Sequence, residues 1–101
     1  MHKHFSYRSV LQLRPWEEHA ISFVNTQIIN NNLGCVYKEE HKNGIDFYFS
    51  NEHAAMILAK RIKKNIGGST LITRKLYSYD KGASRKIGRT TILFKVKQKD
   101  L

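Results

Sequence analysis

The sequence predicts an α+β fold, a two-layer sandwich in which two helices cover one face of a mainly antiparallel sheet. Hydrophobic residues repeat at strand spacing in five segments and at helical spacing in two, in the order β-α-β-β-α-β-β. Helices between strands, together with neighbouring strands joined by hairpins, are typical of this architecture. A chain of 101 residues with 41% hydrophobic side chains can bury one modest core. We therefore expect residues 1–101 to form a single domain.

The first strand is predicted over residues 5–14, where apolar and polar side chains alternate. We expect one side of this strand to face the core: Phe5, Tyr7, Ser9, Leu11 and Leu13. Pro15 should end the strand, and a helix should open at residues 16–18, with Glu17 and Glu18 at the positive end of its dipole. Helical spacing predicts the buried side of this helix: Ala20, Ile21, Val24 and Ile28.

A hairpin is predicted around Asn43-Gly44, a strong turn signal between two strand-like runs. A two-residue turn there would set Phe47 opposite Glu40. A three-residue turn with a glycine bulge would instead pair Phe49 with Tyr37. We favour the second turn, because it gives the hairpin a more apolar inner face.

The second helix should begin at a cap formed by Ser50 or Asn51 and end at Gly67-Gly68. Its core side is predicted by helical spacing: Ala55, Leu58, Ala59, Ile62 and Ile66. Two further strands are expected at 69–80 and 86–97. In the last strand, one set of alternate residues should face the core: Ile92, Phe94 and Val96. The other set should face outward: Arg89, Thr91, Leu93, Lys95 and Lys97.

The positive charge of the chain is concentrated in its C-terminal half. The formal net charge is +10, yet residues 1–59 hold five basic and six acidic side chains. Residues 60–97 hold Asp80 as their one acidic residue, against twelve basic residues: Lys60, Arg61, Lys63, Lys64, Arg74, Lys75, Lys81, Arg85, Lys86, Arg89, Lys95 and Lys97. Such a regional excess indicates a surface for a polyanion, most commonly a nucleic acid.

The last two strands and Tyr48 carry the candidate RNA-binding residues: Tyr48, Arg74, Lys75, Arg85, Lys86, Arg89, Lys95 and Lys97. Clustered cations of this kind bind phosphates with release of counterions. Arg74 or Lys75 should join the outward face of the last strand, depending on the register of the hairpin. Tyr48 should lie on the helix-free face, where a base could stack on it. The alternatives are edge protection by the charged residues and packing of Tyr48 against a neighbouring strand residue such as Lys38.

The second helix carries a candidate protein-contact surface on its solvent side: Ile57, Lys60, Arg61 and Lys64. An apolar residue in the middle of a basic surface indicates contact with another protein. The alternative is a solvated helix face whose cations suit the C-terminal end of the helix dipole.

The sequence contains no catalytic constellation. Its five histidines are scattered, and the side chains of adjacent carboxylates, as in Glu39-Glu40, point in different directions. Paired zinc-binding cysteines, a P-loop and a nucleophile elbow are all missing from the sequence. We therefore expect a protein that is not an enzyme and uses no metal, other cofactor or small-molecule substrate.

The cysteine content and hydropathy favour a cytoplasmic location. Cys35 is the single cysteine, so it cannot form an internal disulfide, and we expect a half-buried thiol in a reducing compartment. The sequence has no apolar run of membrane-spanning length and no secretory h-region at its start. We also expect the chain to be a monomer in isolation.

Several segments resemble the adapter family that exports the large ribosomal subunit from the eukaryotic nucleus, which is named for nonsense-mediated decay protein three and has archaeal relatives. The segments that carry the resemblance are VLQLR at 10–14, GIDFYFS at 44–50, His53-Ala54, Arg74-Lys75-Leu76, Asp80 and Arg89-Thr90-Thr91-Ile92. In that family this region is the middle domain, which is similar in fold to the eukaryotic large-subunit ribosomal protein twenty-two. The motif positions look structural as much as functional, and Asp46 and Asp80 are expected to set turns.

The resemblance implies association with the large ribosomal subunit during maturation or quality control, through rRNA or ribosomal proteins. Family members also carry C-x-x-C zinc pairs and a barrel-like domain, which the sequence given does not contain. The main hypothesis is therefore an RNA-binding module that contacts the rRNA backbone. The alternative is a protein-interaction module that docks on a ribosomal protein, or on a partner chain that carries the zinc and barrel domains. A third hypothesis, a general nucleic-acid chaperone, predicts no preference for ribosomal RNA.

Overall fold

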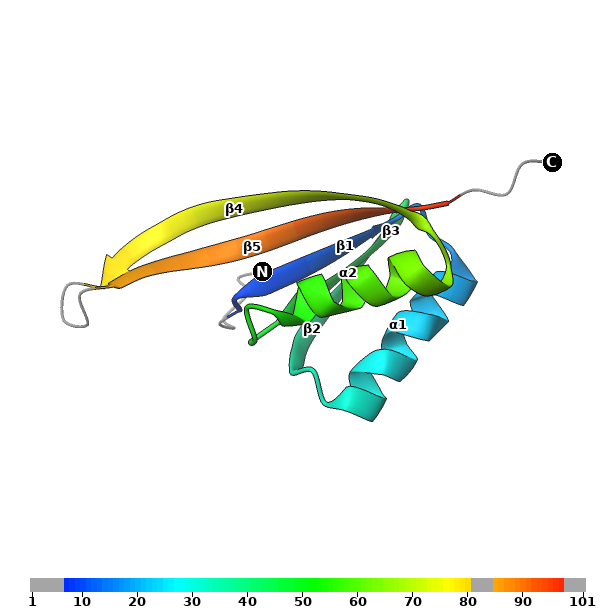
Figure 1. The fold of residues 1–101 in the computed structure, drawn as a ribbon, viewed down its shortest axis with the longest axis horizontal. Helices are drawn as coiled ribbons and strands as arrows, with labels where there is room; N and C mark the ends of the chain where they lie inside the picture. The colour runs from blue at the N-terminus through cyan, green and yellow to red at the C-terminus, as the bar shows by residue number, and fades with distance from the viewer. Residues whose placement is uncertain (1–6, 81–84, 98–101) are drawn as a thin grey trace.

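The computed structural model describes residues 7–80 and 85–97, with the side chains of these residues except those of 75–80 and 85–88. The elements follow the predicted order: β1 (Ser9–Arg14), α1 (Glu18–Asn31), β2 (Cys35–His41), β3 (Gly44–Phe49), α2 (Ala54–Asn65), β4 (Gly68–Asp80) and β5 (Arg85–Val96). Figure 1 shows both helices on the same side of the sheet. The predicted α+β class and element order are confirmed.

The five strands form one sheet in the order β2-β3-β1-β5-β4. Strand β1 lies in the centre, antiparallel to β3 and parallel to β5. The two hairpins, β2–β3 and β4–β5, are antiparallel. The long strands β4 and β5 reach beyond the helices (Figure 1). The sheet is therefore mainly antiparallel, with β2 and β4 as its two edge strands.

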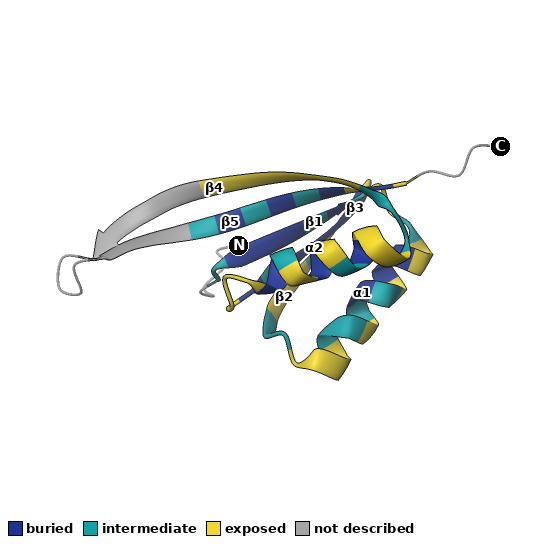
Figure 2. Ribbon diagram, viewed as in Figure 1, coloured by how far each residue is buried: buried dark blue, intermediate teal, exposed yellow. Residues whose placement is uncertain are grey.

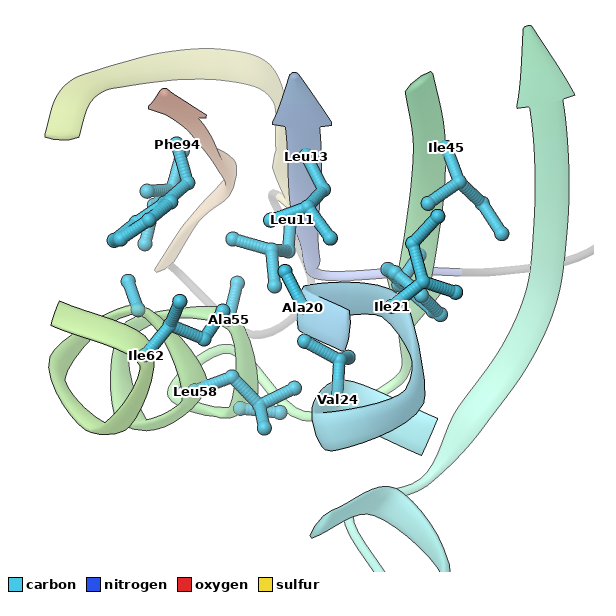
Figure 3. Close-up of a cluster of buried hydrophobic side chains, with 14 of the residues drawn as sticks. Leu11, Leu13, Ala20, Ile21, Val24, Ile45, Ala55, Leu58, Ile62 and Phe94 are labelled. Atoms are coloured by element: carbon cyan, nitrogen blue, oxygen red, sulfur yellow. The ribbon is translucent and has the colours of Figure 1, made fainter. Parts of the chain in front are cut away.

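The core lies between this sheet and the two helices. Side chains from β1, β3 and β5 meet those of α1 and α2 in a single buried cluster, part of which is drawn in Figure 3. Its fully buried members include Leu11, Leu13, Val24, Phe47, Leu58, Ile62, Ile92 and Phe94. At about 25 cal/mol per Å² of apolar surface, burial of such side chains is the main contribution to stability. The predicted core sides of both helices and of the last strand are confirmed.

The start of α1 follows the prediction closely. The Glu17 carboxylate accepts hydrogen bonds from the backbone N–H of His19 at 3.1 Å and of Ala20 at 2.9 Å. The Glu18 carboxylate accepts one from the indole N–H of Trp16 at 2.9 Å. Two N–H groups without helical partners are thereby satisfied, next to the positive end of the helix dipole.

The start of α2 differs from the prediction. Neither Ser50 nor Asn51 is its N-cap, because helical geometry begins at Ala54 after a turn over 51–53. Asn51 instead accepts the His53 N–H through its side chain at 2.7 Å, which closes that turn. The preference of Asn for turn positions therefore outweighed its preference for the cap.

The register of the β2–β3 hairpin also differs from both predicted alternatives. His41 pairs with Gly44, so the turn residues are Lys42 and Asn43 rather than Asn43-Gly44. Gly44 is a strand residue, and a Cβ added to it would clash with the Leu13 carbonyl oxygen of β1. The glycine is required by close approach of the central strand, which the local turn signal did not reveal.

The first strand is shorter than predicted, since β1 begins at Ser9 and the chain bends at Arg8. Phe5 lies outside the described residues. None of the helices in the described part of the chain is long and apolar enough to cross a membrane.

Candidate nucleic-acid interface

The side of the sheet that faces away from α1 and α2 carries no helix within the described ranges, and we call it the open face (Figure 1). Strand alternation places Arg89, Lys95 and Lys97 on this face, because Ile92, Phe94 and Val96 of the same segment are buried toward the helices. Lys95 and Lys97 are exposed, and Arg89 is half-buried. The predicted outward orientation of these cations is confirmed.

The register of β4 and β5 decides which neighbouring cation can join them. Lys75 pairs with Arg89, whereas Arg74 pairs with Thr90. Thr90 belongs to the helix side of β5, so Arg74 is exposed on the side opposite the open face. The side chains of three further candidates lie outside the described ones: Lys75, Arg85 and Lys86. Of the two alternatives that the sequence left open, the register therefore selects Lys75, and not Arg74, as the residue of β4 that is paired with Arg89.

Three tyrosines and Arg89 form a continuous row of contacts across the open face. The guanidinium carbon of Arg89 lies 4.2 Å from the centroid of the Tyr7 ring. The Tyr7 ring meets Tyr48 edge to face, with centroids 4.9 Å apart and an interplanar angle of 79°. Tyr48 in turn lies 5.7 Å from Tyr37, its register partner on β2, at a tilt of 52°. We call Tyr7, Tyr48 and Tyr37 the tyrosine row.

This row combines two groups that bind nucleic acids. Aromatic rings stack on bases, and a guanidinium over a ring can bind a phosphate or stack on a base itself. Tyr48 is half-buried between its neighbours, whereas Tyr37 at the end of the row is 36% exposed. The prediction that Tyr48 lies on the open face is confirmed, but Tyr37 offers the more accessible ring.

Two expectations about this row are corrected by the structure. Tyr7 does not continue the core side of β1, because the bend at Arg8 lets its ring reach Tyr48 on the open face. Tyr48 does pack against a neighbouring strand residue, but this residue is Tyr37 and not Lys38, because Lys38 is paired with Phe47 and its ammonium donates to Asn25 of α1 at 2.7 Å. The sequence signal for the row was the presence of tyrosine in three separate segments, which only the sheet order brings together.

A second cluster lies beside the row, on β1, β2 and β3. The Asp46 carboxylate, 4% exposed as a residue, lies 2.7 Å from a guanidinium nitrogen of Arg14 and 2.9 Å from Nε2 of His41. Glu39 lies 3.7 Å from the same imidazole nitrogen and accepts the Tyr48 hydroxyl at 3.2 Å. Asp46 therefore sits within a strand and holds an ion-pair network, contrary to the expectation that it sets a turn.

This cluster has one imidazole and two carboxylates whose ligand atoms lie within 4.8 Å of one another: Glu39, His41 and Asp46. Such a set can hold a divalent cation. Arg14, however, already neutralises Asp46 and would repel a metal ion at that oxygen. The arrangement is better suited to fixing Asp46, His41 and Tyr48 in place.

Arg14 also connects this cluster to the basic side of the open face. It is the register partner of Lys95, and both line an open pocket of about 590 Å³ together with Pro15, Asn43 and Val96. Its NH1 group donates to the carbonyl oxygens of Leu13 at 3.0 Å and Ile45 at 3.3 Å. These bonds fix the guanidinium against the sheet, whereas Lys95 is exposed at this pocket.

The candidate surface on α2 is only partly as predicted. Lys60 and Lys64 are exposed, and Ile57 is 36% exposed among them. Arg61 instead points toward α1, where it donates to the Gln27 side chain at 2.7 Å. The solvent side of α2 therefore presents Ile57, Lys60 and Lys64, with Lys63 as a further exposed cation.

Cys35 is half-buried, as predicted. Burial raises the pKa of its thiol above the ordinary value of 9.0, against smaller lowering effects of backbone hydrogen bonds and of Lys38. Because the thiolate is the nucleophilic form, this environment does not favour a reactive cysteine.

Comparison with known protein families gives one match that spans most of the chain. The family model described as "NMD3, second domain" matches residues 6–96. No curated protein matches the chain. The matched range contains every element of the sheet and both helices, including the tyrosine row and the cations of β5. The chain therefore belongs to the NMD3 family, as its second domain.

Proposed function

We propose that this domain is a non-catalytic RNA-binding module that associates with the large ribosomal subunit through its open face, in subunit maturation or quality control. The observation that carries the proposal is the contact of Arg89 with the tyrosine row, on the same face of the sheet as the exposed Lys95 and Lys97. The NMD3 family is linked to the large-subunit export adapter, which supports a ribosomal partner. This role also fits a cytoplasmic protein of the archaeal type.

The two parts of the open face suit different parts of an RNA. Lys95 and Lys97 are exposed and can neutralise phosphates, which gives affinity that depends on shape and salt rather than on sequence. The tyrosine row suits unpaired bases, which stack on aromatic side chains in most sequence-tolerant RNA complexes. An rRNA segment with a duplex next to an unpaired loop would engage both parts.

A second candidate function is docking on a protein, either a ribosomal protein or a partner chain with the zinc and barrel domains of the family. It is favoured by Ile57, which is 36% exposed about one turn before the exposed Lys60 on α2. In that case Ile57→Asp, which puts a negative charge on the docking surface, should abolish ribosome association without affecting the affinity for naked rRNA.

The proposal is tested by binding the chain to large-subunit rRNA fragments and to an unrelated RNA duplex over a range of salt. Preference for rRNA fragments, with affinity that falls steeply with salt and weakens in Arg89→Ala/Lys95→Ala, is the expected result. Equal binding to both RNAs would indicate a general nucleic-acid chaperone. No binding at low salt would contradict an RNA role, and unchanged ribosome association would then favour protein docking.

A further inference from the structure

The edge strand β4 offers a binding site that the RNA role does not use. It is the last strand of the sheet and pairs on one side with β5, and no other described strand lies along its second side. An edge strand presents a row of backbone N–H and C=O groups that can pair with another chain. From Gly68 to Leu76 the pairing with β5 is regular, so this part of the edge contains no bulge.

The two edges of the sheet differ in the features that prevent strand addition. Strand β2 has seven residues, an irregularity between Cys35 and Tyr37, and a charged run at its end: Lys38, Glu39, Glu40 and His41. The described side chains of β4 carry one charge over Gly68–Arg74, that of Arg74 itself. Natural edge strands are commonly protected by charges and bulges, and this segment of β4 has little of that protection.

Two apolar residues on this edge are exposed on opposite faces of the sheet. Leu71 is 63% exposed and pairs with Leu93 on the open face. Ile72 is 45% exposed although its register partner Ile92 is fully buried, because α2 covers β5 more than the edge. Figure 2 shows β4 as exposed over residues 69–74. A docked strand would cover both side chains at once, since it extends both faces of the sheet.

The charge around this edge selects the kind of strand that fits. Arg74 on β4 and Lys95 on β5 are exposed, the chain as a whole carries +10, and Lys75 follows in the same strand. A second copy of the chain would carry the same charge of +10, and this repulsion disfavours a dimer through β4. An acidic segment would be attracted to the same place.

We propose that the β4 edge binds an extended acidic segment of a partner protein, which adds to the sheet as a sixth strand. Backbone hydrogen bonds to β4 give affinity, and side chains of the segment give specificity. Two adjacent apolar residues of the segment would lie opposite Leu71 and Ile72. An acidic residue of the segment, two positions from the one opposite Ile72, would lie opposite Arg74. This proposal does not depend on RNA binding, because it uses the edge of the sheet rather than the tyrosine row.

The test uses the full chain and a short fluorescent peptide in which two adjacent valines are separated from a glutamate by one threonine. Fluorescence anisotropy should show saturable binding to the wild type. Leu71→Thr/Ile72→Thr keeps strand propensity and should weaken binding by about tenfold, since it removes apolar contact on both faces. Val36→Thr, at an exposed apolar position on the β2 edge, is the matched control and should bind as the wild type does.

Two further comparisons separate strand addition from attraction by charge alone. Methyl groups on alternate backbone nitrogens along one edge of the peptide should abolish binding, whereas the same groups along its other edge should have no effect. Arg74→Glu should lose the acidic peptide and bind a peptide with lysine in place of glutamate.

Equal binding of both methylated peptides, absence of binding at millimolar peptide, or a β4-dependent dimer of the chain would each overturn the proposal. Unchanged RNA affinity in Leu71→Thr/Ile72→Thr, together with loss of peptide binding, would show that the two sites are separate.

Discussion

Arg89 on β5 lies over the ring of Tyr7, with its guanidinium carbon 4.2 Å from the ring centroid and its Nε–H donating to the Tyr7 carbonyl oxygen at 3.2 Å. The contact joins residues that are 82 positions apart in the chain. It connects the basic strand of the open face to the tyrosine row, so cations and stacking rings belong to one surface.

Replacement of Arg89 by lysine separates its charge from its geometry. Arg89→Lys keeps the positive charge but loses the planar group that stacks on Tyr7, so the free energy of unfolding should fall by about 0.5–1 kcal/mol. The salt dependence of RNA binding should stay as in the wild type, because the charge is kept. Arg89→Ala should lose both. Urea unfolding and salt titrations check this, and a lysine variant with the alanine variant's salt slope would contradict it.

Tyr37 should contribute a stacking contact at the exposed end of the tyrosine row. Tyr37→Ala should weaken binding of single-stranded RNA by about 1–2 kcal/mol, and Tyr37→Phe should bind like the wild type, since the ring is kept. Binding of a fully paired duplex should not respond to either change. Equal losses for the single strand and the duplex would show that Tyr37 acts through the fold and not through a base.

The pair of Arg14 and Asp46 should stabilise the sheet mainly by compensating a buried charge. Arg14→Ala leaves the buried Asp46 carboxylate without its guanidinium partner and should lower the free energy of unfolding by about 2–3 kcal/mol. This loss is smaller than for a fully buried ion pair, because Arg14 is partly exposed. The double variant Arg14→Met/Asp46→Leu should recover most of that loss. Denaturant unfolding of Arg14→Met, Asp46→Leu and the double variant measures the coupling between the two side chains, and additive losses would exclude it.

The Cys35 thiol should contribute to the pH dependence of stability only in alkaline solution, above its ordinary pKa of 9.0. Burial raises its pKa in the folded chain above 9.0, so the unfolded chain ionises first as the pH rises. The stabilising contribution is fully present below pH 9.0 and is lost as the pH rises through the folded pKa. Wild type should therefore lose stability relative to Cys35→Ala in alkaline urea titrations but not at neutral pH. A relative loss that is already complete at neutral pH would contradict this assignment.

Patterns confined to one element predicted much of the fold. Helical spacing identified Leu58 and Ile62 as core residues, and strand alternation identified Phe94. Both predictions succeed because apolar residues recur at the period of an element when one of its sides is buried. The position of Glu17 at the positive end of α1 was also predicted, since it depends on neighbours in sequence, but its role as the N-cap was not.

Features that depend on another element were predicted less well. The turn at Lys42-Asn43 follows from the space that Gly44 leaves for the Leu13 carbonyl, and Leu13 belongs to a different strand. The tyrosine row needs β1 to lie between β3 and β5, an order that local periodicity does not encode. The sequence left open whether Arg74 or Lys75 faces outward for the same reason, because the register of β4 and β5 depends on pairing along the whole hairpin.

The most direct test of the proposed interface compares two charge-matched variants in salt titrations of rRNA binding. Lys95→Ala/Lys97→Ala removes two exposed cations from the open face, and Lys60→Ala/Lys64→Ala removes two from the solvent side of α2. If RNA lies on the open face, the first variant should reduce the slope of log affinity against log salt by about 1.5, and the second should change it by less than about 0.5. The reverse pattern would place the RNA on α2 and contradict the account.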